Sequence, residues 1–321
     1  MSGLVASLQG RTRSERDSRV GLAFVSPTLL VVLLVVVFPV LWTFLLSFQQ
    51  LRVSDLDDVG LLNAQYTLEN FAQVLTSRDF LTGLRVTLTY SVLGTAGAIG
   101  LGLVAALVVR RPFRGRTLVR GFMLIPYVAP IVSVAFVWRV MLNPQFGVVN
   151  AIGADVFGWD RPVAFLTQRS TEVGLLGLNF NIPLALTMVI LFEAWRSFPF
   201  AFLFILARLQ ALPADLDEAA KIDGAAPTQR FRYIVLPQLS GVIALLVLLR
   251  FIWTFNSFDE IYLLTGGGAG TDVVAVQAFQ YLTARNDVGR ASALSVVLAL
   301  ILMVLLVIYL RVFVRGRGEQ A

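Results

Sequence analysis

The sequence contains no cysteine and no histidine. Disulfides, thiol chemistry, imidazole general bases and the commonest zinc ligands are therefore excluded together. Lysine occurs once, at Lys221, and no Gly-x-x-x-x-Gly-Lys-Ser/Thr loop surrounds it to hold nucleotide phosphates. Charged residues make up only 14% of the chain. We therefore expect a protein that is not an enzyme and that binds no metal or cofactor itself.

Apolar residues are abundant instead: 57% of the 321 residues are hydrophobic, and the mean hydropathy is +0.78. A bilayer core needs about 20 apolar residues per helix, and six runs are long enough. The fifth is interrupted by Arg250. The pattern predicts an all-α integral membrane bundle of six transmembrane helices, at Leu22 to Phe48, Leu84 to Val109, Val119 to Leu142, Ile182 to Ala207, Leu239 to Phe255 and Ala291 to Val314. The first run lacks a small-residue cleavage site, so we expect it to be retained as a helix.

The basic residues are distributed unevenly between the two sides of these spans. Most lie in the N-terminal tail, in "RRPFRGR", in the fourth connection and in the C-terminal tail. Cytoplasmic segments carry such an excess, which predicts that both termini face the cytoplasm. We expect cytoplasmic tails at 1–20 and 316–321 and a transmembrane domain at 21–315. The net charge of +6 is explained by this orientation, so lipid is the expected partner and nucleic acid is not.

A charged stretch, "LPADLDEAAKIDGAAPTQRFRYIVLP", interrupts the apolar pattern near the fourth connection. Pro213 suits the first position of a helix, and the acidic residues after it favour a helix N-terminus. Gly224 stands where a left-handed cap would end that helix. Pro227 offers a second start, and Pro237 introduces the fifth span. We predict helix, turn and helix along the cytoplasmic surface, which either lie at the lipid headgroups or pack against protein.

The same stretch resembles the EAA loop of ABC importer permeases, in its Glu-Ala-Ala, its Gly six residues after that Glu, and its Ile-x-Leu-Pro. Three more segments are similar to MalF-like permeases of the carbohydrate-uptake branch: "RGFMLIPYVAPIVSVAFVWRVMLNPQFGVVN", "FEAWRSFPFAFLFILARLQALP" and "FNSFDEIYLLTGGG". The resemblance covers most of the chain from about Val20. It implies a type I importer permease fold in a bacterial or archaeal cell membrane.

The resemblance also implies the partners and a coupling site. The expected partners are a second homologous permease, two copies of a cytoplasmic ATPase that uses ATP and Mg²⁺, and an extracytoplasmic solute-binding protein. Residues 213–237 would be the coupling segment that docks into the ATPase. The residues expected to shape that contact are Glu218, Ala219, Ala220, Asp223 and Gly224. Those expected to anchor the segment to the fifth span are Ile234, Leu236 and Pro237.

Polar residues inside the apolar runs predict a pathway. Glu193 and Arg250 each cost about 2.5 to 3.5 kcal/mol near the bilayer centre, and both fall near mid-depth, where they could pair. The candidate pathway residues are Tyr127, Glu193, Arg196, Arg250, Trp253, Asn256 and Ser257. From Arg250 to Glu260 the spacing places such residues near one helix face. That face either lines the pathway or packs against a partner permease or neighbouring helices.

Two further features bear on shape. Pro126 and Pro130 in "IPYVAP" should bend the third span, as a moving element or as a fixed kink. The glycine run Gly266 to Gly270 resembles an outer turn of these permeases, although the family's proline is missing here.

The resemblance implies ATP-driven sugar import by alternating access, with this chain forming half of the pathway. Polyols and glycerol phosphate are alternative substrates. A passive channel or a membrane scaffold is an alternative of a different class. A channel would need no docking segment, and a scaffold would need no Arg and Glu at mid-membrane.

Overall fold

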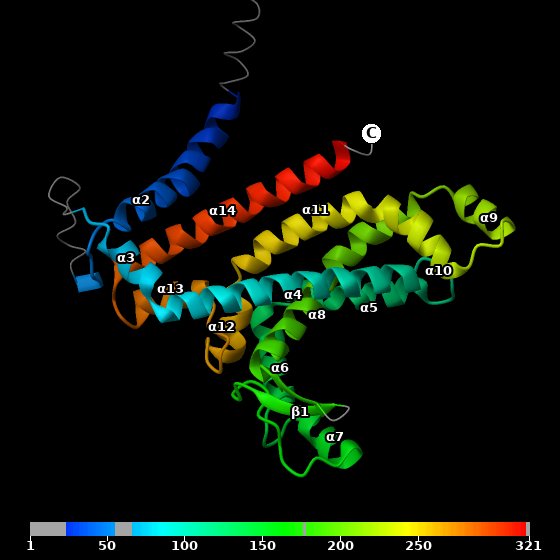
Figure 1. The fold of residues 1–321 in the computed structure, drawn as a ribbon, viewed down its shortest axis with the longest axis horizontal. Coiled ribbons are helices and arrows are strands. Elements are labelled where there is room, and N and C mark those ends of the chain that lie inside the picture. The colour runs from blue at the N-terminus through cyan, green and yellow to red at the C-terminus, as the bar shows by residue number, and fades with distance from the viewer. Residues whose placement is uncertain (1–23, 55–65, 176–177, 319–321) are drawn as a thin grey trace, which may run out of the picture.

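The computed structural model describes residues 24–54, 66–175 and 178–318, and within these the chain is mostly helical (Figure 1). The predicted tail 1–20 and the end of the predicted tail 316–321 lie outside the described residues. In chain order the elements are η1 (Leu33–Val37), α2 (Phe38–Leu46), α3 (Glu69–Thr76), α4 (Arg78–Val108), α5 (Arg116–Val128), α6 (Ile131–Met141), α7 (Val148–Phe157), β1 (Thr171–Leu175), β2 (Leu178–Ile182), α8 (Leu184–Gln210), α9 (Ala214–Ile222), α10 (Pro227–Arg230), η3 (Phe231–Val235), α11 (Leu236–Phe255), α12 (Asp259–Thr265), α13 (Val274–Thr283) and α14 (Val288–Gly318).

Among the described residues, five helices are long and apolar enough to cross a membrane by themselves. They are Phe24–Leu46, Arg78–Val108, Leu184–Gln210, Pro227–Phe255 and Val288–Val312. The third predicted span, Val119 to Leu142, is broken, because α5 and α6 meet at a bend of 95°. The all-α membrane bundle is confirmed, and six spans are reached when this bent pair is counted as one.

The bend between α5 and α6 has a local cause. Ala129 ends α5 with φ −66° and ψ 141°, which is an extended conformation. Its successor is Pro130, and the ring of a proline disfavours helical dihedrals at the preceding residue. Pro126 lies inside α5 without ending it. The predicted kink is therefore confirmed, but the single helix drawn from Val119 to Leu142 is wrong.

Close packing between α4 and α8 forms the centre of the molecule. The two helices run side by side, with α5 against α8 (Figure 1). Glycines on α4 allow this approach: a Cβ added to Gly97 would lie 2.8 Å from the Cβ of Ala194, and one added to Gly102 would lie 2.7 Å from the Cβ of Ala201. Such small residues let membrane helices come together where no hydrophobic force drives them.

Two π-helical turns precede prolines at the start of apolar helices. η1 comes just before Pro39, and η3 comes just before Pro237. A proline inside a helix removes an N–H and crowds the carbonyl four residues earlier, and a wider turn relieves that clash. The chain therefore runs from Pro227 to Phe255 as one helix. The fifth span begins earlier than Leu239, and the second short helix of the charged stretch is its first part.

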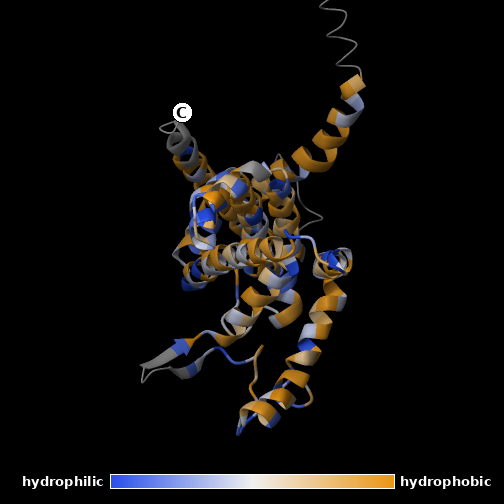
Figure 2. Cartoon of the chain, turned by 90° about the vertical axis from the view of Figure 1, so that its right-hand side faces the viewer, coloured by the Kyte–Doolittle hydropathy of each residue, from blue (hydrophilic) through white to orange (hydrophobic). Residues whose placement is uncertain are grey.

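The connections after the first and third spans form small elements. α7 and a two-stranded antiparallel hairpin of β1 and β2 follow α6, with Thr171 opposite Ile182. α3 packs against α4 and α14. The first helix, in contrast, is exposed along residues 24–41, and most of this surface is apolar (Figure 2). Such a surface needs lipid or another membrane chain to cover it.

Candidate functional site

A cavity of about 590 Å³ opens between α8, α11 and α12. Its walls combine charged, amide, hydroxyl and aromatic side chains in an otherwise apolar molecule. The lining residues are Tyr127, Glu193, Arg196, Ser197, Arg250, Trp253, Asn256, Ser257, Phe258, Asp259 and Glu260. All seven pathway residues that the sequence predicted lie here together. Whether solute passes over them stays a prediction.

The innermost polar group is a buried ion pair. Arg250 on α11 donates a hydrogen bond through Nη2 to Oε1 of Glu193 on α8, as the depth of both residues predicted. Two hydroxyls complete the cluster: Ser197 donates to the same oxygen at 3.0 Å, and Thr254 donates to it at 3.2 Å. Arg250 also donates to Ser197 at 2.6 Å. Because each charge is paired and hydrogen-bonded, the cluster is tolerated inside the membrane.

A second ion pair lies nearer the opening of the cavity. Nη1 of Arg196 is 3.2 Å from Oε1 of Glu260, and both side chains are largely buried. This contact joins α8 to α12 and brings together residues 64 positions apart. The two arginines of the lining thus each face a glutamate, which leaves little free positive charge in the cavity.

Trp253 is the aromatic surface of the site. It is 46% exposed, and its ring meets Phe200 edge-on at 5.1 Å. The guanidinium of Arg250 lies 5.6 Å from the ring centroid, which favours a cation–π contact. Two further tryptophans, Trp138 and Trp195, contact each other with ring centroids 5.6 Å apart and the rings tilted by 46°, and both lie outside the lining. An exposed ring beside hydrogen-bonding groups is the composition that fits the C–H face of a sugar.

The predicted single helical face is wrong in one respect. α11 ends at Phe255, with Asn256 as its C-cap, and Glu260 belongs to the separate helix α12. Asn256 donates to the carbonyl oxygen of Ile252 at 2.9 Å, and this bond satisfies the end of α11. The break turns α12 so that Glu260 reaches Arg196. The stripe is therefore a junction of two helices, which periodicity alone cannot show.

Sequence reasoning missed three contributors to this site. Ser197 and Thr254 hold the carboxylate of Glu193, and Gly94 makes room for it, since a Cβ there would lie 3.0 Å from Cγ of Glu193. A usable signal existed. Ser197 stands four residues after Glu193, Thr254 stands four after Arg250, and Gly94, Ala98 and Gly102 repeat at the spacing of small residues at helix contacts.

The coupling segment has the predicted helix and turn. α9 covers Ala214–Ile222, with Pro213 as its N-cap. Gly224 has φ +76°, which is the left-handed conformation expected at the cap. The N–H of Ala225 donates to Ala220 at 2.9 Å and closes the turn. Among the described residues, no atom lies within 4 Å of a Cβ added at Gly224, so its backbone conformation, and not a close contact, requires glycine there.

The exposed and buried faces of the coupling segment are distinct. Glu218, Ala219 and Asp223 are exposed and Ala220 is buried, while Ile222 is 87% exposed at the tip. The contacts that join the segment to the core belong to Val235 and Leu239, which are almost fully buried. Of the predicted anchors, Ile234 is half-buried, whereas Leu236 and Pro237 are exposed. Val235 and Leu239 are about one helical turn apart, so both lie on the helix face that packs against the core.

The glycine run from Gly266 to Gly270 forms a tight loop between α12 and α13. Gly266, Gly267 and Gly270 have positive φ, and so does Ala269 at +53°. Asp272 follows, and its Oδ2 accepts from Nε2 of Gln277 at 3.0 Å. Burial raises the pKa of the Asp272 carboxyl, and the Gln277 hydrogen bond opposes that shift.

Among the described residues, no group of three acidic side chains is arranged to hold a metal ion.

Comparison with known proteins assigns the family. The family described as "Binding-protein-dependent transport system inner membrane component" matches residues 98–317. The Escherichia coli (strain K12) inner membrane ABC transporter permease protein YcjO is 34% identical, over 91% of this chain and 93% of that protein. The trehalose/maltose transport system permease protein MalF of Thermococcus litoralis is 33% identical, over 92% and 94%.

A solved structure shows the same fold. A chain of a bacterial ABC transporter involved in the import of the acidic polysaccharide alginate superposes with a TM-score of 0.78, at 21% identity, over 94% of this chain and 98% of that one. The chain therefore belongs to the family of inner membrane components of binding-protein-dependent transport systems and is a multi-pass permease subunit of an ABC importer.

Proposed function

We propose that this permease carries a neutral sugar and that the cavity around Trp253 is its passage. The observation that carries the proposal is the pairing of both lining arginines with glutamates beside a half-exposed indole ring. The amide of Asn256 and the hydroxyl of Ser257 add hydrogen-bonding groups at the same opening. Relatives named for trehalose and maltose transport support this substrate class.

The pairing of both lining arginines with glutamates also distinguishes between neutral and anionic substrates. A phosphorylated polyol such as glycerol phosphate would need free cationic side chains, whereas Arg196 and Arg250 already face carboxylates. Breaking either pair would leave a buried carboxylate uncompensated, which is costly. Neutral polyols fit the lining as sugars do. The cavity chemistry thus favours neutral polyhydroxylated solutes over anionic ones.

Energy for transport would come from separate subunits. In our proposal, α9 docks into a cytoplasmic ATPase, two copies of which use ATP and Mg²⁺. Ile222 supplies an apolar tip for that contact, and the continuous helix from Pro227 to Phe255 transmits its movement to the cavity. A second, homologous permease would complete the pathway and cover the exposed first helix. A solute-binding protein would deliver the sugar from outside, and access would alternate between the two sides.

The proposed orientation places both termini in the cytoplasm of a bacterial or archaeal cell. Arg110, Arg111, Lys221 and Arg230 gather at one end of the bundle, with the coupling segment. Cytoplasmic ends of membrane helices are enriched in such residues. The hairpin of β1 and β2, with α7, would then lie outside.

Trp253→Ala tests the proposal, and Trp253→Phe is the matched control because it keeps a ring. In vesicles that contain the assembled transporter, we expect Trp253→Ala to lower sugar uptake by tenfold or more, which corresponds to about 1.4 kcal/mol of lost ring contact. Trp253→Phe should retain most uptake. Assembly that fails before uptake is affected would make the stripe a packing surface, and uptake that continues without ATPase would indicate a channel.

A further inference from the structure

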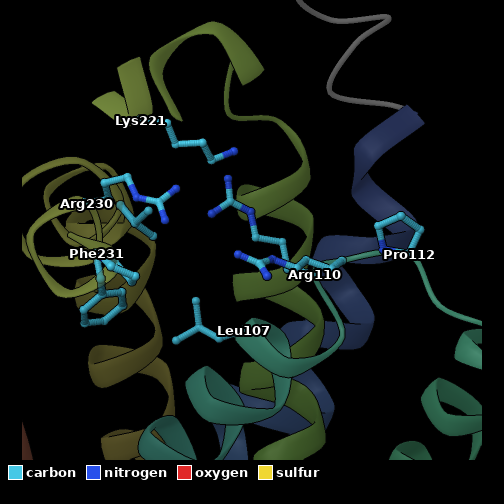
Figure 3. Close-up of a pocket in the computed structure, with 9 residues that line it drawn as sticks. Leu107, Arg110, Pro112, Lys221, Arg230 and Phe231 are labelled. Carbon is cyan, nitrogen blue, oxygen red and sulfur yellow. The ribbon is translucent and has the colours of Figure 1, made fainter. Parts of the chain in front are cut away.

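A second cavity, of about 820 Å³, lies at the end of the bundle that carries the coupling segment. Four of its lining residues are cationic: Arg110 and Arg111 from the turn after α4, and Lys221 and Arg230 from the coupling segment. Figure 3 shows Arg110 facing Lys221 and Arg230 across the same space, with Leu107 and Phe231 below them. Among the described residues, none of those lining the cavity is acidic. The site is therefore suited to an anion.

The positive charge available to a ligand is that of Arg110 and Arg111, because Lys221 and Arg230 already interact with other residues. Neither arginine forms an ion pair with a described residue. The turn that presents them is braced by Arg116, whose Nε donates to the carbonyl oxygen of Val109 at 2.7 Å and whose Nη2 donates to that of Arg110 at 3.0 Å. These bonds hold the backbone at the rim of the cavity, so the two charges are positioned before a ligand arrives.

An apolar groove of about 520 Å³ adjoins this basic cavity. Pro227 and Phe231 line both spaces, and Leu236 extends the groove along the helix toward the membrane. A small anion would use only the basic half. An anionic headgroup with an acyl chain would fill both, because the cations would contact its phosphate and the groove would cover its chain.

The position of the two cavities fits the edge of the bilayer. α4 ends at Val108, and the fifth span begins at Pro227, so both mark the same end of the bundle. Under the orientation in our proposed function, this is the cytoplasmic surface. Anionic lipids are concentrated there, and basic pockets between helix ends bind their headgroups.

We propose that this site binds an anionic phospholipid of the cytoplasmic leaflet. Arg110 and Arg111 hold its phosphate at the basic end of the cavity, and one acyl chain follows the groove from Phe231 to Leu236. The lipid bridges the turn after α4 and the segment that docks the ATPase. Membrane orientation alone does not account for this arrangement, since Arg114 would serve orientation equally well and lies outside the cavity lining.

The test measures lipid retained by the assembled transporter. The complex is extracted from vesicles of phosphatidylcholine and phosphatidylglycerol in equal parts, and bound lipids are identified by native mass spectrometry. We expect preferential retention of phosphatidylglycerol. Arg110→Gln and Arg111→Gln should each weaken it about fivefold, whereas Arg114→Gln, in the same turn, should leave it unchanged. Equal retention of both lipids, or equal loss in all three variants, would overturn the proposal.

A second arm separates a lipid from a soluble anion. Inorganic phosphate is added to the complex during extraction, and Phe231→Asn is compared with the unchanged chain. Displacement of phosphatidylglycerol by millimolar phosphate, with no effect of Phe231→Asn, would assign the site to a free anion and overturn the lipid proposal. Retention that resists phosphate and falls in Phe231→Asn supports it. If the ATPase fills this space, the assembled complex will show no retention that depends on Arg110.

ATP-coupled sugar uptake is recorded on the same preparations. Preferential retention without uptake would contradict the proposed function and leave the lipid site intact. Uptake without preferential retention would reject the lipid site alone.

Discussion

Arg250 and Glu193 pair across the interface of α11 and α8, and the glutamate oxygen accepts hydrogen bonds from three side chains at once. Glu193 is 1% exposed, and Arg250 is 6% exposed. Removing either partner would leave a buried charge with no counter-charge, which costs far more than removing both. This pair therefore couples the stability of the bundle to the geometry of the cavity.

The first prediction tests whether Arg250 and Glu193 stabilise the bundle by neutralising each other. Arg250→Met alone should lower the stability of the purified permease by about 3 to 5 kcal/mol, because it isolates the Glu193 carboxylate. The double variant Arg250→Met with Glu193→Gln should recover most of that loss. Thermal unfolding in mild detergent measures both. If the double variant were as unstable as the single one, mutual neutralisation would not be the role of the pair.

The second prediction concerns helix packing at Gly94. A Cβ there would lie 3.0 Å from Cγ of Glu193 and 3.3 Å from Cγ2 of Thr254, so Gly94→Val should cost about 1 to 3 kcal/mol through overpacking. Gly100→Val is the matched control on the same helix, because no atom lies within 4 Å of its added Cβ. Unfolding curves of the two variants should differ. If both variants lost the same stability, the effect of valine on the helix itself, and not overpacking at Gly94, would explain the loss.

The third prediction concerns the turn at Gly224. Its φ of +76° strains any residue with a Cβ by about 1 to 3 kcal/mol, so Gly224→Asp should abolish ATP-coupled uptake and ATPase recovery while membrane insertion persists. Gly224→Asn should be milder, since asparagine tolerates this conformation better. Gly115→Asp carries the same strain at φ +85° in another loop and should keep the ATPase bound. Normal ATP-coupled uptake in Gly224→Asp would contradict the docking of this segment into the ATPase.

The fourth prediction uses the absence of cysteine to test orientation. Arg114→Cys and Arg161→Cys each introduce one thiol at an exposed position, in the turn after α4 and in the segment after α7 respectively. A maleimide that cannot cross the membrane should label Arg161→Cys in intact cells and Arg114→Cys only after permeabilisation. The reverse pattern would invert the proposed topology.

The fifth prediction concerns pH and Asp272, in the loop between α12 and α13. Burial raises the pKa of this carboxyl in the folded chain, so its ionised form opposes folding. Stability should fall as pH rises from the ordinary aspartate value through the raised one. Asp272→Asn should therefore raise the melting temperature at neutral pH and lose that advantage in acid. Asp160→Asn, at an exposed position, serves as control. If it raised the melting temperature as much, burial of Asp272 would not explain the effect.

Periodicity and charge were enough to predict the bundle, the coupling turn and the pairing of Glu193 with Arg250. Each is a local or one-dimensional signal: a run long enough to cross a bilayer, a glycine after an amphipathic segment, or two charges at equal depth. The break at Asn256 was missed, because the polar spacing continues across it. The 95° angle after Val128 was missed as well, since a proline indicates a bend but not its size.

The sequence by itself determined that this chain enters a membrane and where its charged segment interrupts the apolar pattern, because the composition of each segment decides its transfer into lipid. Tertiary structure decided which polar residues meet. Thr254 on α11 reaches the Glu193 carboxylate on α8 beside Gly94 of α4, where an added Cβ would lie 3.0 Å from Cγ of Glu193 and 3.3 Å from Cγ2 of Thr254. Arg110, after α4, and Lys221, on α9, line one cavity although they lie far apart in the sequence. Such meetings depend on contacts between distant segments, and residue order does not encode their distances.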